Sequence, residues 1–430
     1  MTKRAPRTRG LKTLLLAAFG LVAAAGAFGQ RNLQEPWERE PAWLHFERGR
    51  AAFASRDFGQ ALVYFDRAAE TRRLASESAV ARLSFALESS KAQAVGDSIQ
   101  GLLSAFAAED FLAGDYRRIM DAAGPSWRQR LLALRQERLG ENHRALVDAL
   151  LVALEYRPME RFKDSLRALS DELRLLARYP EAEYWKGKVF FMEGELALAE
   201  RQFYRAFDWR EALDPPQFVY TILYELAALH EAKAAGAPPP ARGAARGDSL
   251  DLWEGVMARI LDGERSGDGI TLDERLLNSM RESLLAHGFD RFMTLYRIEP
   301  GYSLAANLAL GSYYLERGRA QALVRSALGV NMLLTRAIAL VRERDFDYVW
   351  AGLDDFWRVM ARHEAAREYL EESGFEKALF TLADALFVAG SRTHAEALWT
   401  TLARRAGVPY AAMAASRLAN PAGAVRRAGP

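Results

Sequence analysis

The chain has 430 residues, half of them apolar and 27% charged, as is typical of a soluble protein with a sizeable core. It contains no cysteine, which excludes disulfide bonds, thiolate catalysis and cysteine-ligated zinc. The formal net charge is +2, but five of the 58 basic residues and no acidic residue lie within residues 1–29. The rest of the chain carries 53 basic and 56 acidic residues, so its charge gives no indication of nucleic-acid binding.

Residues 1–29 have the three parts of a secretory signal peptide. Basic residues precede an apolar run from Leu14 to about Phe28, and small residues crowd the end of that run. The run is shorter than the roughly 20 residues that span a bilayer comfortably. We expect cleavage after Ala27 or Gly29 and a periplasmic or secreted protein, with an uncleaved N-terminal anchor as the alternative. No later apolar run is expected to span a membrane.

The sequence beyond Pro41 predicts helices almost throughout. Apolar residues recur at intervals of three and four, as in Leu146, Leu150 and Ala153, and no strand alternation is seen. The prolines fall mainly where helices should begin or end. The predicted fold class is therefore all-α.

Two distant segments share one spacing of small and aromatic residues. Each interval in the first set is repeated in the second, which indicates a repeat architecture. The two sets are Gly49, Phe53, Phe58, Ala61, Phe65, Ala68 and Gly187, Phe191, Leu196, Ala199, Phe203, Ala206.

These residues resemble the tetratricopeptide repeat, whose pattern is a small residue, an aromatic, a tight turn, and then alanine, aromatic and alanine. The resemblance is strongest over residues 46–68 and 184–206, moderate over 380–403 and weak near 305–330 and 140–158. It implies a right-handed superhelical solenoid of stacked antiparallel helical hairpins that binds peptides or partner surfaces in a concave groove. The alternative is a set of helical hairpins that converged on the same packing.

The spacing of the matches predicts an irregular solenoid. Gly49, Gly187, Gly311 and Ala383 are separated by 138, 124 and 72 residues. A uniform array repeats about every 34 residues, and only the first and last separations come close to multiples of that length. Degenerate repeats or insertions are therefore expected between the matches.

The resemblance also implies which residues face the groove. These positions lie three residues before and one residue after the small residue of each first helix. Such a surface suits an extended peptide with apolar and acidic groups, although the aromatic residues are equally consistent with core packing. The predicted groove residues are Phe46, Arg50, Tyr184, Lys188, Phe380 and Asp384.

The predicted organisation has two repeat regions, residues 30–235 and 249–419. Between them, residues 236–248 are rich in proline, glycine and alanine and read either as a surface loop or as a linker between domains. Residues 420–430 are expected to form a disordered tail.

Motifs for chemistry are missing from the sequence. The six histidines form no metal-ligand pattern, and no phosphate-binding or nucleophile motif is present, so no cofactor, metal or catalytic residue is predicted. Residues 262–274 superficially resemble a calcium-binding loop, but Glu274 arrives one residue early for the bidentate ligand. Thr271 to Glu274 also forms a capping box, so a glycine-rich turn before a helix is favoured over calcium.

The sequence thus predicts a non-catalytic scaffold of the bacterial cell envelope that binds a protein or peptide partner. Two alternatives stay open. One is a structural subunit of an outer-membrane, secretion, cell-wall or periplasmic flagellar assembly that binds by its edges. The other is a solenoid-type enzyme acting on the cell wall, for which no region supplies a recognisable catalytic glutamate.

Overall fold

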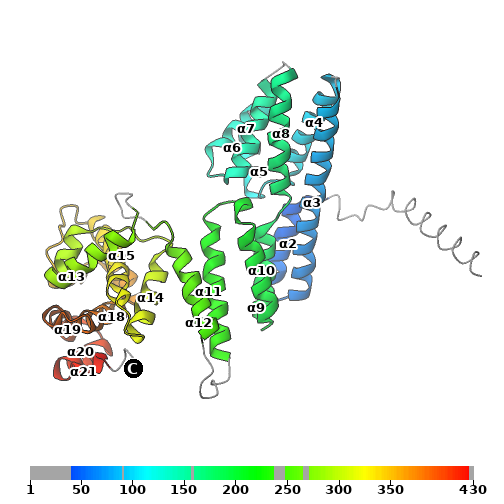
Figure 1. Cartoon of the computed structure of the whole chain (residues 1–430). Coiled ribbons are helices and arrows are strands. Elements are labelled where there is room, and N and C mark those ends of the chain that lie inside the picture. The colour runs from blue at the N-terminus through cyan, green and yellow to red at the C-terminus, as the bar shows by residue number, and fades with distance from the viewer. Residues whose placement is uncertain (1–39, 90–91, 156–158, 237–246, 265–270, 426–430) are drawn as a thin grey trace, which may run out of the picture. The chain divides into compact units, whose positions relative to one another are not determined.

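The computed structural model describes residues 40–89, 92–155, 159–236, 247–264 and 271–425, which form helices and no strand (Figure 1). The all-α fold class is therefore confirmed. The chain divides into two compact units, Met1–Ile222 and Leu223–Pro430. The predicted signal peptide, residues 1–29, lies outside the described residues.

The first unit contains both of the strongest repeat matches, and each forms a helical hairpin. Gly49 of α2 and Gly187 of α9 face the aromatic ring of the following helix, Phe65 and Phe203 respectively. Because glycine has no Cβ, the two helices of each hairpin approach closely at this point. The four helices are α2 (Ala42–Ala54), α3 (Phe58–Glu88), α9 (Pro180–Met192) and α10 (Leu196–Asp208).

The two hairpins of the first unit are direct neighbours in space, although 138 residues separate their glycines. Helix α9 packs against α3 and also contacts α2. A shared core joins them, in which Tyr179 and Val189 pack with Phe65 and Trp185. The 138-residue separation therefore reflects an insertion between the two hairpins. Its closeness to a multiple of the repeat length does not correspond to any feature of the structure.

The insertion includes the second half of the long helix α3. The first half of α3 packs on α2, and its second half contributes Leu83 to a separate core with Phe106 and Leu146 (Figure 1). Five helices complete this part of the unit: α4 (Ala92–Ala108), α5 (Asp115–Ala122), α6 (Trp127–Gln136), α7 (Glu141–Glu155) and α8 (Met159–Leu176).

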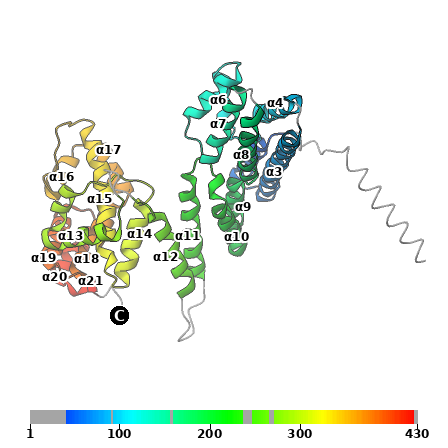
Figure 2. The ribbon, with the colours of Figure 1, turned by 45° about the horizontal axis from the view of Figure 1, so that its top comes forward.

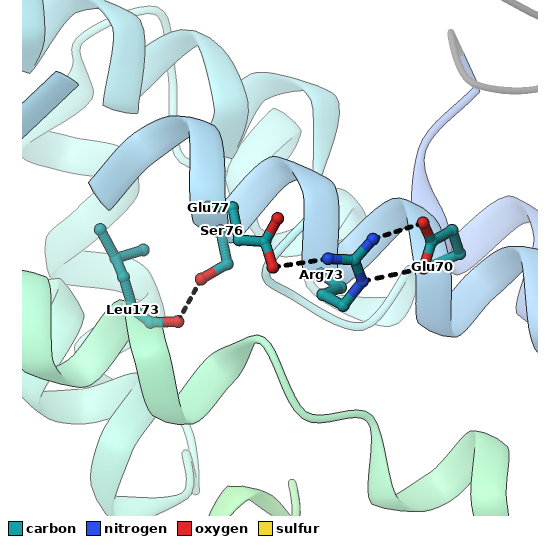
Figure 3. A network of polar contacts seen from close by, with 5 residues as sticks. All are labelled: Glu70, Arg73, Ser76, Glu77 and Leu173. Carbon is teal, nitrogen blue, oxygen red and sulfur yellow. Dashed lines mark hydrogen bonds and ion pairs between the residues drawn. The ribbon is translucent and has the colours of Figure 1, made fainter. Parts of the chain in front are cut away.

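The middle of α3 presents different chemistry on its two sides. On the exposed side, Arg73 bonds Glu70 and Glu77, three residues before it and four after it (Figure 3). On the buried side, the Ser76 hydroxyl donates to the Leu173 carbonyl oxygen of α8 at 2.5 Å. This hydrogen bond satisfies a polar group that would otherwise be costly to bury, and it ties the insertion to the first hairpin.

The turns of four hairpins share one backbone geometry. The residue seven positions after the small residue has positive φ, at Arg56, Gly194, Gly318 and Gly390. The next N–H donates to a carbonyl five residues earlier, as from Asp57 to Ala52 and from Glu195 to Phe190, both at 2.9 Å. This is the Schellman arrangement that ends a helix. The same bond joins Arg319 to Tyr314 and Ser391 to Leu386.

The second unit also contains two hairpins that are neighbours in space. Helix α14 pairs with α15, α18 pairs with α19, and α18 packs against both members of the first pair (Figure 2). Thus the third and fourth repeat matches also lie side by side, with two short helices between them in sequence. The helices are α12 (Gly247–Leu261), α13 (Glu274–Leu295), α14 (Leu304–Glu316), α15 (Gln321–Arg342), α16 (Leu353–Met360), α17 (Glu364–Glu372), α18 (Phe375–Val388), α19 (Arg392–Arg405), α20 (Tyr410–Ala419) and α21 (Ala422–Val425).

Helix α15 is long and apolar enough to cross a membrane, which the sequence analysis did not expect of any later segment. It is the one such helix among the described residues, and 78% of its apolar window is buried inside the protein. It contacts α13, α14, α17 and α18. Burial of this extent is what the central helix of a hydrophobic core shows.

The boundaries of the units differ from those predicted. The division falls at Ile222, inside α11 (Phe218–Gly236), and not within residues 236–248. The start of α11 packs with the first unit through Phe218 and Tyr184, whereas Tyr224 bonds the Tyr302 carbonyl oxygen in the second. Most of the predicted linker, residues 237–246, lies outside the described residues. The expected disorder of the tail is wrong for α21, which packs against α18.

Candidate binding groove

The predicted groove residues of the first unit lie on two neighbouring helices. Phe46 of α2 is half-buried and stacks on Tyr179, with ring centroids 5.2 Å apart. Arg50 is exposed, pairs with Glu47 at 3.0 Å and lies 5.8 Å from the Trp185 ring. Aromatic packing therefore occupies Phe46, while Arg50 remains accessible.

On α9, Tyr184 and Lys188 differ in exposure. Tyr184 is 5% exposed and contacts Phe203 and Phe218, so its predicted exposure is wrong. Lys188 is half-buried. The ring of Tyr184 fills the space between α9, α10 and α11, as the core-packing alternative anticipated.

Phe380 and Asp384 of α18 are fully buried, which also contradicts their predicted exposure. Helix α20 covers them. Tyr410 lies 6.3 Å from Phe380, and Arg417 binds both carboxylate oxygens of Asp384, with the shortest contacts at 3.1 Å. Trp399 of α19 donates a further hydrogen bond to Asp384 at 3.2 Å. These two positions therefore bind helix α20 of the same chain.

A cavity of about 730 Å³ lies in the second unit among α11, α12, α14, α15 and α18. We call it the α14–α18 groove. On α14 it is lined at one-turn intervals by Ala305, Leu308, Ser312 and Glu316, and on α18 by Lys377 and Thr381. Residues three and four apart share a helix face, so the exposed faces of two neighbouring first helices form its floor.

Aromatic residues form one wall of the α14–α18 groove. The rings of Trp253 on α12 and Tyr313 on α14 are 4.7 Å apart, and Met257 completes the apolar surface. The Arg317 guanidinium lies 3.6 Å from the centre of the Tyr313 ring, in a cation–π contact. Burial raises the pKa of the Tyr313 hydroxyl above its ordinary value.

Several polar groups that line the same groove have no side-chain partner in the described part of the chain. Glu231, Glu316 and Glu372 are exposed and form no ion pair within the described part of the chain. The Ser326 side chain is 3% exposed, and its hydroxyl finds no hydrogen-bond partner among the described residues. A concave, partly aromatic surface with a few unpaired polar groups is the usual form of a binding site.

The sequence analysis missed the α14–α18 groove because the third repeat match is weak beyond Leu323. The residue spacing around Gly311 nevertheless indicates this groove. The rule that selected Phe46 and Arg50 selects Leu308 and Ser312 around Gly311, and both line the groove. The same rule fails on α18 because α20 covers Phe380 and Asp384. The spacing of residues within α18 does not reveal this covering helix.

The loop that resembled a calcium site has a structural role at both described ends. Glu264 is 3% exposed and its carboxylate accepts hydrogen bonds from Asn307 at 2.6 Å and Arg325 at 3.0 Å. Asp273 caps α13 by accepting from the Leu276 N–H, so the cap lies two residues after Thr271, the N-cap of the predicted capping box. Residues 265–270 lie outside the described part, and no metal-binding cluster occurs in the residues that are described.

A second polar cluster lies in the core of the first unit. The Asp214 carboxylate accepts from the Gly140 N–H, and the Asp214 N–H donates to Glu181 at 3.0 Å. His143 Nε2 lies 2.9 Å from the Phe111 carbonyl oxygen, and burial lowers the pKa of His143 to about 4. The Asp214 bonds join the insertion to the second hairpin and the segment that follows it. His143 Nδ1, Asp214 Oδ2 and Glu181 Oε2 are buried without a hydrogen-bond partner among the described residues.

Comparison of the chain with protein families and with curated proteins finds no match.

Proposed function

We propose that this protein is a non-catalytic scaffold built from hairpins of the tetratricopeptide type, and that it binds an extended protein segment in the α14–α18 groove. The shared turn geometry and the glycine contacts of the hairpins support the family assignment. The faces of α14 and α18 support the binding role, because they leave a groove of about 730 Å³ that no other described part of the chain fills.

The groove carries the proposal because its chemistry suits a peptide. Trp253, Met257 and Leu308 offer apolar contact, whereas Ser312 and Thr381 offer hydrogen-bond partners. Aromatic anchors beside a few polar groups are common at sites that bind protein segments. A small cofactor would be expected to meet a cluster of convergent, perturbed acids and bases, and the pKa shift described in this groove is confined to Tyr313 and arises chiefly from burial.

The leader-like composition of residues 1–29 supports a location in the cell envelope under this proposal. An edge-binding structural subunit is the second candidate. The exposed side chains of Phe346 and Val349, 82% and 67% accessible, favour it because they put apolar surface on a loop away from the groove.

The proposal is tested by selecting ligands from a random peptide-display library on the purified full chain. Binding of one labelled selected peptide is then measured by fluorescence anisotropy to the parent protein and to Ser312→Trp, which fills the groove. Arg404→Trp is the matched control, because Arg404 is exposed on α19 and does not line the groove.

We expect Ser312→Trp to weaken binding by about tenfold or more and Arg404→Trp to leave it unchanged. Equal affinities for the three proteins, or failure to recover any peptide sensitive to Ser312→Trp, would contradict groove binding. Circular dichroism on both variants checks that their helix content matches that of the parent.

A further inference from the structure

The charges in the α14–α18 groove are unbalanced. Glu231, Glu316 and Glu372 are the acidic residues of its lining, and Arg317 and Lys377 are its cations. Arg317 is engaged by the Tyr313 ring and by the Tyr313 carbonyl oxygen at 3.4 Å. Both partners of Arg317 are neutral, so the lining carries three carboxylates against two cations, and Lys377 forms no ion pair in the described part of the chain.

The wall of the same groove also contains a buried, unpaired hydroxyl. Ser326 of α15 is 3% exposed, lines the groove, and has no hydrogen-bond partner among the described residues. This hydroxyl lies against the backbone of Gly311 on α14, where the two helices of the hairpin meet at the edge of the groove. The groove thus combines unpaired negative charge with an unsatisfied polar group beside the aromatic wall.

We infer that the α14–α18 groove selects a basic extended segment, with a lysine or arginine side chain held among Glu231, Glu316 and Glu372. An apolar neighbour in that segment packs on Trp253 and Met257. This inference rests on the proposed function and names the chemistry of its ligand. It reverses the expectation of an acidic peptide, which was drawn from Arg50 and Lys188 in the first unit.

The electrostatic reason is complementarity. Three carboxylates in one concave space raise the local negative potential, which attracts a cationic group and disfavours an acidic one. Trp253 is 7% exposed, so the part of it that lines the groove offers a small apolar contact to the aliphatic stem of such a side chain. Because the carboxylates are exposed, salt screens the attraction, so affinity should fall as ionic strength rises.

The test uses the peptides recovered on the full chain, sorted by whether Ser312→Trp abolishes their binding. We expect the sensitive peptides to be enriched in lysine and arginine over aspartate and glutamate. For one such peptide, Glu316→Gln and Glu372→Gln should each weaken binding about two- to tenfold. Glu371→Gln is the matched control, because Glu371 neighbours Glu372 but pairs with Arg367 outside the groove. Lys377→Gln should leave binding unchanged or strengthen it.

The outcomes separate this inference from the proposed function. Peptides that are sensitive to Ser312→Trp but rich in acidic residues would overturn the inference and leave groove binding intact. Equal affinity for the parent, Glu316→Gln and Glu372→Gln would do the same. If no recovered peptide is sensitive to Ser312→Trp, the groove proposal itself fails, and the inference fails with it.

Discussion

The backbone of Gly49 lies directly against the ring of Phe65, because a Cβ built on Gly49 would come within 2.6 Å of Cε1 of that ring. Gly187 bears the same relationship to Phe203, also at 2.6 Å. In both hairpins the aromatic is sixteen positions after the glycine and is fully buried. One packing solution is therefore used twice in neighbouring hairpins of the first unit.

We predict that Gly49→Ala destabilises the protein by about 1–3 kcal/mol, since the buried ring must shift to admit the methyl group. Gly59→Ala is the control. Gly59 lies in the first turn of α3 with nothing within 4 Å of its added Cβ, so alanine there should be neutral or slightly stabilising. Urea-unfolding midpoints of the two variants check this, and equal midpoints would contradict the role given to Gly49.

The hairpin turns supply a second prediction. Arg56 has a φ of 62°, whereas the equivalent Gly194 has a φ of 79° and open space around it. Because this region is unfavourable for residues with a Cβ, Arg56→Gly should stabilise the protein by up to about 1 kcal/mol, and Gly194→Ala should destabilise it by about 1 kcal/mol. Thermal unfolding of both variants measures the effect, and shifts in the same direction would refute the shared turn geometry.

His143 predicts a pH dependence of stability. Burial lowers its pKa to about 4, below the ordinary value of 6.5. Between these values the unfolded chain binds a proton that the folded chain does not, so stability falls as the pH decreases from 6.5 to 4. The full effect is about 3 kcal/mol at 1.36 kcal/mol per pKa unit.

The contribution of His143 is isolated by comparison with His143→Gln. Burial raises the pKa of Glu109 to about 7 and that of Asp110 to about 6, and these acids act in the opposite direction. The difference in unfolding free energy between parent and variant removes their contribution. We expect that difference to shrink as the pH falls from 6.5 to 4, and a constant difference would exclude His143 as the titrating group.

The docking of α20 depends on the ion pair between Asp384 and Arg417. Asp384 is fully buried, and its removal leaves the Arg417 guanidinium without its carboxylate partner. Asp384→Ala should cost about 3 kcal/mol or more and should expose α20 to proteolysis. Arg358→Ala, which breaks the exposed pair with Asp355, should cost less than about 1 kcal/mol. Limited proteolysis with mass mapping distinguishes the two, and an uncut α20 in Asp384→Ala would contradict its dependence on this pair.

The sequence predicted hairpin positions well because the pairs that define them are local. Gly187 and Phe203 lie on consecutive helices, so their spacing alone predicts their contact. The spacing could not predict that α9 would pack on α3. The insertion between them has its own core and does not follow the repeat spacing.

The same limit explains the errors at the candidate groove. Exposure of Phe380 and Asp384 depends on Tyr410 and Arg417, which lie beyond the repeat pattern that selected these positions. The groove walls likewise include Trp253, a residue far from α14 in sequence. Helix faces can be predicted from spacing, but what covers a face is set by tertiary contacts.

The location of ligand binding tests the central proposal most directly. Hydrogen–deuterium exchange is measured on the full chain with and without a saturating peptide selected on it. We predict that protection is concentrated in residues 305–317 and 372–381, the segments of α14 and of the α17–α18 region that line the groove. Protection confined to α2 and α9, or to the loop that carries Phe346, would contradict it.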